Sequence, residues 1–143
     1  MKKYKVGFTA GVFDMFHIGH LNLLRNAKAM CEFLIVGVNS NNLVMDYKGK
    51  ETVIDEEQRR EIVSAIRYVD RVEIMKSLDK VDAWKHYNFD VVFIGDDWKG
   101  SERWNQTEGD LAKIGVKVEY IPYTKNITST KLRGSHENRV KEN

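Results

Sequence analysis

Two histidines near the N-terminus have the type and spacing that suit phosphate chemistry. His17 and His20 stand three residues apart with Gly19 between them, so both side chains would share one face of a helical turn. An apolar alternation through Val6 and Phe8 precedes them, and a helical pattern follows. The pair therefore lies in a strand-to-helix turn, where backbone N–H groups and the helix dipole can hold a phosphate that approaches closely over the glycine.

This arrangement favours nucleotidyl transfer. The sequence contains neither a G-x-x-x-x-G-K-[ST] loop nor a G-x-G-x-x-G turn, so phosphate binding would depend on the histidine turn and on cations from elsewhere in the chain. A phosphate oxygen of the acceptor would attack the α-phosphorus of a nucleoside triphosphate as pyrophosphate leaves, which requires positioning and charge neutralisation but no protein nucleophile. We assign His17 and His20 to the α- and β-phosphate oxygens.

Composition and charge describe one small domain. The chain has 143 residues, a formal net charge of +2, and Lys and Arg interspersed with Asp and Glu, which argues against a dedicated nucleic-acid binder. A single cysteine, Cys31, cannot form an internal disulfide, which fits a reducing compartment. The N-terminus has no apolar signal region, and no 18 apolar residues run together, so we expect a cytoplasmic protein without a membrane partner.

The elements that must position these side chains alternate between strands and helices. Apolar runs predict strands, besides the one before the histidine turn, at residues 33–38, 69–75, 91–94 and 116–121. Helical spacing predicts helices at residues 21–31, 55–66, 79–87 and 107–114, with a last turn at 128–132. This alternation predicts a doubly wound parallel α/β sheet, whose first, fourth and fifth strands should end at one ligand site.

Residues 39–50 lack a sustained hydrophobic period. They are polar and contain three asparagines together with Gly49. We predict a loop that closes over bound substrates as a lid and carries Lys48.

Further motifs accompany the histidines, and together they resemble the cytidylyltransferase family. The runs Gly11-Val12-Phe13-Asp14 and His17-Ile18-Gly19-His20 are similar to the family's G-(T/I/V)-F-D and H-x-G-H pair at this spacing. The similarity continues through Lys48, the R-Y-V-D run of residues 67–70, the G-D-D-W run of residues 95–98 and a degraded closing segment at residues 123–130. It covers nearly the whole chain and is strongest toward the small bacterial glycerol-3-phosphate members.

The resemblance implies a single Rossmann-like, doubly wound α/β domain with a five-stranded parallel sheet over residues 1–133, followed by a charged tail at residues 134–143. It implies transfer of CMP from CTP to a small phosphorylated alcohol, foremost sn-glycerol 3-phosphate, giving CDP-glycerol and pyrophosphate. Mg²⁺ would accompany the nucleotide, and the product would be a precursor of teichoic acid or capsule. Members of the family are commonly homodimers, with the R-Y-V-D run near the dimer contact.

The resemblance also assigns roles to individual residues. His17, His20 and Lys48 are the expected catalytic residues, with Lys50 as a substitute for Lys48 in the same segment. Lys48, Asp96 and Trp98 would contact the acceptor. The residues expected to bind the nucleotide are Val12, Phe13, Asp14, Gly19, Arg67, Asp96, Tyr123, Thr124, Ile127, Thr128, Ser129 and Thr130.

Some assignments leave an alternative open. Asp14 either orients a histidine or hydrated Mg²⁺, or caps the turn before the first helix. A zinc site at this residue and the histidine pair lacks a fourth Cys or His ligand, so no protein-held metal is predicted. Arg67 either binds the triphosphate or pairs with Asp70, and Arg59 is as readily a solvated surface residue as a phosphate ligand.

The closing segment departs from the family's R-T-E-G-I-S-T-T pattern. Tyr123 replaces arginine, although Lys125 offers a cation nearby, and Asn126 replaces glycine with the residue that best tolerates the left-handed conformation. The hydroxyl side chains of residues 128–130 still suit a phosphate at a helix start. The altered segment supports an alternative of another class, a non-catalytic nucleotide-binding subunit.

Aromatic residues support an alternative acceptor, choline phosphate. Quaternary ammonium groups bind in cages of aromatic rings. Such aromatics are more often core or dimer-contact residues, so glycerol 3-phosphate is preferred and other phosphorylated alcohols are kept open. The candidate cage residues are Tyr87, Trp98, Trp104 and Tyr123.

Overall fold

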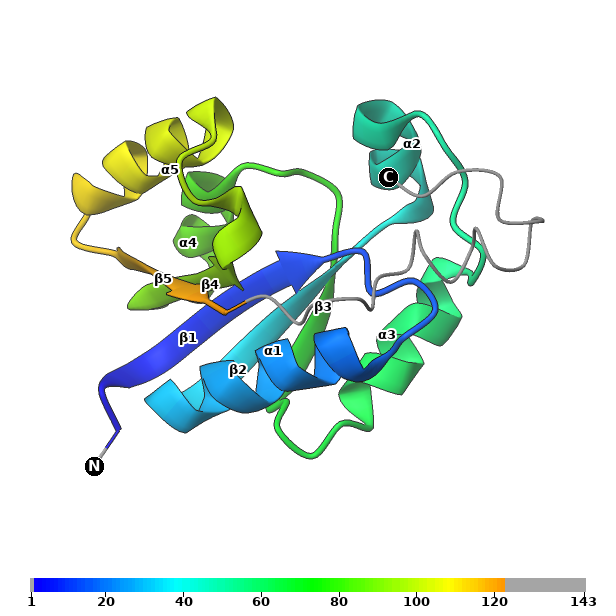
Figure 1. Ribbon diagram of the computed structural model, residues 1–143, viewed down its shortest axis with the longest axis horizontal. Coiled ribbons are helices and arrows are strands. Elements are labelled where there is room, and N and C mark those ends of the chain that lie inside the picture. The colour runs from blue at the N-terminus through cyan, green and yellow to red at the C-terminus, as the bar shows by residue number, and fades with distance from the viewer. Residues whose placement is uncertain (1, 123–143) are drawn as a thin grey trace.

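The computed structural model describes residues 2–122, in which a five-stranded parallel sheet is layered between helices (Figure 1). No helix in this part of the chain has the length and apolar character needed to cross a membrane. In chain order the elements are β1 (Tyr4–Gly11), α1 (Ile18–Met30), β2 (Cys31–Asn39), α2 (Asn41–Lys48), α3 (Glu56–Ser64), β3 (Arg71–Met75), α4 (Lys80–Tyr87), β4 (Val91–Gly95), the 3₁₀ turn η1 (Asp96–Trp98), α5 (Glu102–Ala112) and β5 (Lys117–Ile121).

The strand order β3-β2-β1-β4-β5 places β1 at the centre of the sheet, and every neighbouring pair is parallel. The chain builds outward from β1 to β3 and then returns to the other side of β1 to add β4 and β5. The carboxyl ends of β1 and β4 therefore stand side by side where the strand order reverses, which is where parallel α/β sheets bind ligands. The doubly wound sheet predicted from the sequence is confirmed, including the edge position of β3.

Alternate residues of the central strands pack into two hydrophobic layers. Leu34, Val36 and Val38 of β2 belong to the core under α1 and α3, whereas Ile35 belongs to the core shared with α2, α4 and α5. Each fully buried side chain of this size contributes about 1.5–3 kcal/mol to folding. The continuous apolar run in β2 therefore serves both faces of the sheet, apart from Phe33, which is exposed.

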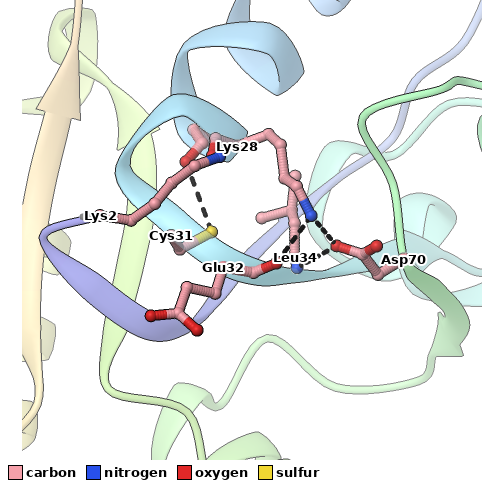
Figure 2. A network of polar contacts seen from close by, with 7 residues as sticks. Lys2, Lys28, Cys31, Glu32, Leu34 and Asp70 are labelled. Atoms are coloured by element: carbon pink, nitrogen blue, oxygen red, sulfur yellow. Dashed lines mark hydrogen bonds and ion pairs between the residues drawn. The ribbon is translucent and has the colours of Figure 1, made fainter.

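Lys28 and Asp70 tie the amino-terminal ends of β2 and β3 together (Figure 2). The Asp70 carboxylate forms an ion pair with Lys28 Nζ and accepts a hydrogen bond from Leu34 N at 2.8 Å. Lys28 Nζ also donates to Glu32 O at 2.8 Å. Asp70 therefore binds the backbone of β2, and its ion-pair partner is Lys28 rather than Arg67.

Residues 39–50 contain helix α2, so the predicted loop is wrong. The Ser40 hydroxyl accepts a hydrogen bond from Leu43 N at 3.1 Å and caps the start of the helix. Leu43 and Val44 are buried, and Gly49 ends the helix in the left-handed conformation with φ 68°. A helix of two turns anchored by one apolar pair is too short to produce the sustained period by which sequence reasoning detects helices.

Three details of the predicted helices also need correction. Helix α1 ends one residue early, so the buried Cys31 begins β2. Helix α5 begins before residue 107, because Ser101 caps its start and Trp104, 2% exposed, anchors its first turn. In α3, Ile62 is exposed and does not face the core as expected.

Candidate active site

A cavity of about 490 Å³ opens at the carboxyl ends of β1, β4 and β5. The histidine turn after β1 forms part of its wall, and Lys48 at the end of α2, Lys80 at the start of α4 and Arg103 in α5 line it as well. The turns after the first and fourth strands meet here as expected. The fifth strand contributes Ile121 and Pro122, whereas the closing segment at residues 123–130 and the predicted turn at 128–132 lie outside the described residues.

The turn that carries the histidines has a strained backbone. Phe13 and Met15 adopt positive φ values of 54° and 49°, which bulky residues seldom do. Phe13 is buried, and its ring meets the His20 ring edge-on with 5.4 Å between centroids. Such conformations cost about 1–3 kcal/mol each and persist where the surrounding packing fixes them, commonly at functional sites.

The two histidines cap helix α1 through reciprocal hydrogen bonds. His17 Nδ1 accepts from Gly19 N at 3.0 Å, and His20 Nδ1 accepts from His17 N at 3.1 Å. Their rings stack with centroids 3.9 Å apart. Because Nδ1 accepts in both rings, each neutral imidazole carries its proton on Nε2 and can donate a hydrogen bond from that nitrogen to a ligand.

Burial keeps this histidine pair neutral. It lowers the pKa of His20 to about 3, with repulsion from His17 as the second cause, and it also lowers the pKa of His17. His17 Nε2 is buried and has no hydrogen-bond partner among residues 2–122. An unpartnered buried N–H costs about 1–3 kcal/mol, so a ligand oxygen that accepts from it would remove a standing penalty.

Asp14 lines the cavity, as expected from the motif, but it is not the residue that caps α1. Its carboxylate is buried and accepts hydrogen bonds from Val53 N at 2.7 Å and Ile54 N at 2.9 Å. It therefore fixes the segment before α3 against the histidine turn and does not cap α1. No group of three His, Cys, Asp or Glu side chains suited to a metal ion occurs within the described residues.

The candidate lysines lie at the opposite end of α2 from its cap. Lys48 is the last residue of the helix, its Nζ lies 5.9 Å from the Tyr47 ring centroid, and both it and Lys50 line the cavity. Desolvation lowers the pKa of Lys48, and the charge of Lys50 lowers it further. Lys48 therefore lines the cavity from the end of a helix, and not from a loop as predicted.

Sequence reasoning missed two cations and one carboxylate in the cavity wall. Lys80 is 8% exposed and donates to Leu78 O at 3.0 Å, and burial lowers its pKa to about 8, with Arg103 as the second cause. The carboxylate that lines the cavity after β4 is that of Asp97, where the sequence analysis expected Asp96. Burial raises the pKa of Asp97. Lys80 begins the helix that follows β3 after a short connection, and this place near the carboxyl edge of the sheet was the signal available in the sequence.

Aromatic rings lie directly against these cations. The Arg103 guanidinium lies 5.6 Å from the Trp98 ring centroid and 5.9 Å from that of Trp104. Lys80 Nζ lies 5.6 Å from the Trp104 ring centroid. Trp98 therefore lines the cavity as expected, but both tryptophans already face protein cations.

The other assigned residues divide into three groups. Val12, Phe13 and Gly19 line the cavity with the histidines, as expected from the motif. Arg67 is exposed, is not among the described residues of the cavity wall, and lies 6.0 Å from the Tyr68 ring centroid. The third group lies outside the described residues and comprises Tyr123, Thr124, Ile127, Thr128, Ser129 and Thr130.

Comparisons with known proteins agree with this geometry. A family model described as cytidylyltransferase-like matches residues 8–135. The chain is 35% identical over 127 residues to glycerol-3-phosphate cytidylyltransferase of Bacillus subtilis strain 168, covering 87% of this chain and 92% of that protein. It is also 35% identical over 126 residues to the Staphylococcus aureus protein of the same name, covering 87% and 89%.

A solved structure extends the likeness to three dimensions. The lipopolysaccharide core biosynthesis protein from Thermoplasma volcanium GSS1 has a TM-score of 0.72 and 25% sequence identity to this chain. The match covers 87% of this chain and 99% of that one. The two proteins thus share the architecture that forms the cavity.

Proposed function

The chain belongs to the cytidylyltransferase-like family, and from that premise we propose that it transfers CMP from CTP to sn-glycerol 3-phosphate, giving CDP-glycerol and pyrophosphate. The similarity to two proteins named glycerol-3-phosphate cytidylyltransferase, each over most of its length, supports this choice of substrates. The single observation that carries the chemistry is the buried Nε2 of His17 in the cavity wall, for which residues 2–122 offer no hydrogen-bond partner.

The reaction needs donors on the side of the triphosphate. His17 and His20 would donate hydrogen bonds from Nε2–H to α- and β-phosphate oxygens and would stay neutral while they do so. Lys48 and Lys50 would neutralise the charge that grows on the departing pyrophosphate. An accompanying Mg²⁺ would be bound by the phosphates and water, as this ion commonly is, since the described residues offer no cluster of ligands for it.

The acceptor side of the cavity suits a phosphate linked to a polyol. Lys80 and Arg103 would bind the acceptor phosphate, and Asp97 would accept hydrogen bonds from its hydroxyl groups. Choline phosphate is less favoured, because the faces of Trp98 and Trp104 already meet cations. A quaternary ammonium group would be repelled there. Tyr87, another candidate cage residue, stacks instead on Phe8 with 6.2 Å between centroids.

Pyrophosphate release tests the proposed activity directly. Purified protein is incubated with Mg²⁺, one nucleoside triphosphate and one acceptor, and the panel crosses CTP, ATP, GTP and UTP with glycerol 3-phosphate, choline phosphate and other phosphorylated alcohols. We expect the highest kcat/KM with CTP and glycerol 3-phosphate. If CTP binds but no pyrophosphate is released with any acceptor of the panel, the protein is instead a non-catalytic nucleotide-binding subunit.

Assembly and cellular role complete the proposal. A homodimer, with the exposed Arg67 and its neighbour Tyr68 near the contact, would follow the habit of the family. Sedimentation at micromolar concentration that gave only a 16.6 kDa species would contradict it. We place the enzyme in the cytoplasm, where CDP-glycerol would supply teichoic acid or capsule synthesis.

A further inference from the structure

Arg59 is a buried cation at the junction of three segments. Its side chain is 1% exposed, although sequence reasoning left it between a surface residue and a phosphate ligand. The guanidinium donates from Nε to Ile54 O at 2.8 Å, from Nη1 to Val12 O at 2.8 Å and Asn39 O at 2.7 Å, and from Nη2 to Asn41 Oδ1 at 2.7 Å. Arg59 is not among the described residues that line the cavity, so it does not act as a phosphate ligand.

The four acceptors belong to different segments around the cavity, and two of them, Val12 and Asn39, line it. Val12 lies in the turn that leads to the histidines, and Asn39 ends β2. Asn41 begins helix α2, whose last residue is Lys48. One side chain therefore connects the segment that carries the imidazoles to the helix that carries the lysine.

A second contact strengthens the same junction. The Asp14 carboxylate receives the N–H groups of Val53 and Ile54, while Ile54 O receives Arg59 Nε. Thr52, a residue of the cavity wall, donates to Asn41 Oδ1 at 3.1 Å. The Asp14 contacts hold the backbone between Lys48 and α3 against the histidine turn, and the Thr52 contact holds it against the start of α2.

We propose that Arg59 is a positioning residue that sets the distance between the histidine turn and helix α2, so that His17, His20 and Lys48 reach one triphosphate together. Only arginine can do this, because its planar group directs five N–H bonds outward from three nitrogens, whereas lysine offers three from one nitrogen. The catalytic part of the inference depends on the proposed function, but the geometric part does not.

A distance measurement tests the geometric part. Spin labels are attached at Ile18→Cys and Met45→Cys, which replace side chains that are 46% and 43% exposed, while the native Cys31 is buried. Electron paramagnetic resonance then reports the distance distribution between the histidine turn and α2. We expect a narrow distribution with Arg59 and a broader or shifted one in Arg59→Lys.

A neighbouring arginine provides the matched control. Arg60 has a side chain that is 41% exposed and pairs with Glu57, so Arg60→Lys should leave the distribution unchanged. An Arg59→Lys distribution as narrow as that of Arg60→Lys, at the same mean distance, would overturn the proposal. Should Arg59→Lys fail to fold, Asn41→Ala decides by the same criterion, because it removes one acceptor and keeps the guanidinium.

Kinetics test the catalytic part in the same proteins. Misplacement by about 1 Å can reduce a rate by about 100-fold, so Arg59→Lys should lower kcat by about 10- to 100-fold while the KM for CTP changes by less than about threefold. A residue that merely stabilised the fold would lower the melting temperature and leave kcat unchanged below it. Wild-type protein without turnover would refute the proposed function, yet the distances would still decide the positioning role.

Discussion

Neutral histidines in the active site make a quantitative prediction about folding stability and pH. Burial, and secondly the charge of His17, disfavour the protonated form of His20 and lower its pKa in the folded protein from the ordinary value of 6.5 to about 3. Below pH 6.5 the unfolded chain therefore takes up a proton that the folded chain does not, and stability must fall as pH decreases. With 1.36 kcal/mol per pKa unit, the loss attributable to His20 between pH 7.5 and pH 5 is about 2 kcal/mol.

Denaturant unfolding measured across this pH range checks the magnitude. The assay compares wild type with His20→Asn, whose amide oxygen can still accept from His17 N. The pH-dependent loss should be about 2 kcal/mol smaller in the variant. The matched control is His86→Asn, which removes an exposed histidine of α4. If wild type and His20→Asn gave parallel curves, His20 would protonate in the folded protein as it does in the unfolded chain, and the conclusion that burial lowers its pKa would be refuted.

Three further substitutions separate the roles of the cations. Lys48→Ala should lower kcat/KM by about 10- to 150-fold, with losses in both kcat and the affinity for CTP, because Lys48 lines the cavity. Normal steady-state kinetics of this variant would instead assign the role to Lys50. Arg67→Ala should leave CTP affinity within about threefold by calorimetric titration, and a larger loss would contradict its placement away from the cavity. Lys80→Met should raise the KM for the acceptor by about tenfold or more, with the exposed Lys85→Met as control. In wild type that KM should rise above pH 8, as Lys80 loses its proton, and a flat profile would argue against this assignment.

The sequence predicted those parts of the fold that depend on hydrophobic patterns among neighbouring residues. Apolar runs such as residues 33–38 and 91–94 identified the strands, and the alternation of elements then fixed the sheet and the edge where the site forms. Helix α2 was not predicted because its stability depends on the Ser40 cap and on two buried residues, Leu43 and Val44. Leu43 packs in a core that is built from segments distant in the sequence.

The unpredicted parts of the site depend on contacts between distant residues. Arg59 is buried because its guanidinium donates to the carbonyl groups of Val12 and Asn39. Both residues lie far from Arg59 in the sequence, so no local pattern indicates these contacts. The exchange of Asp96 for Asp97 has a local cause, since successive residues of a 3₁₀ turn differ by about 120° in direction. A motif match locates such a turn, but it does not determine which of the two carboxylates reaches the cavity.

The helix cap that His17 provides affects how an inactive form should be made for trapping substrates. Because His17 Nδ1 accepts from Gly19 N, truncation to alanine removes a cap worth about 1 kcal/mol together with the Nε2 donor. Asparagine is among the strongest capping residues and has no nitrogen at the position of Nε2. His17→Asn is therefore the substitution by which CTP and its acceptor could be held together, unreacted, in a protein that still folds normally.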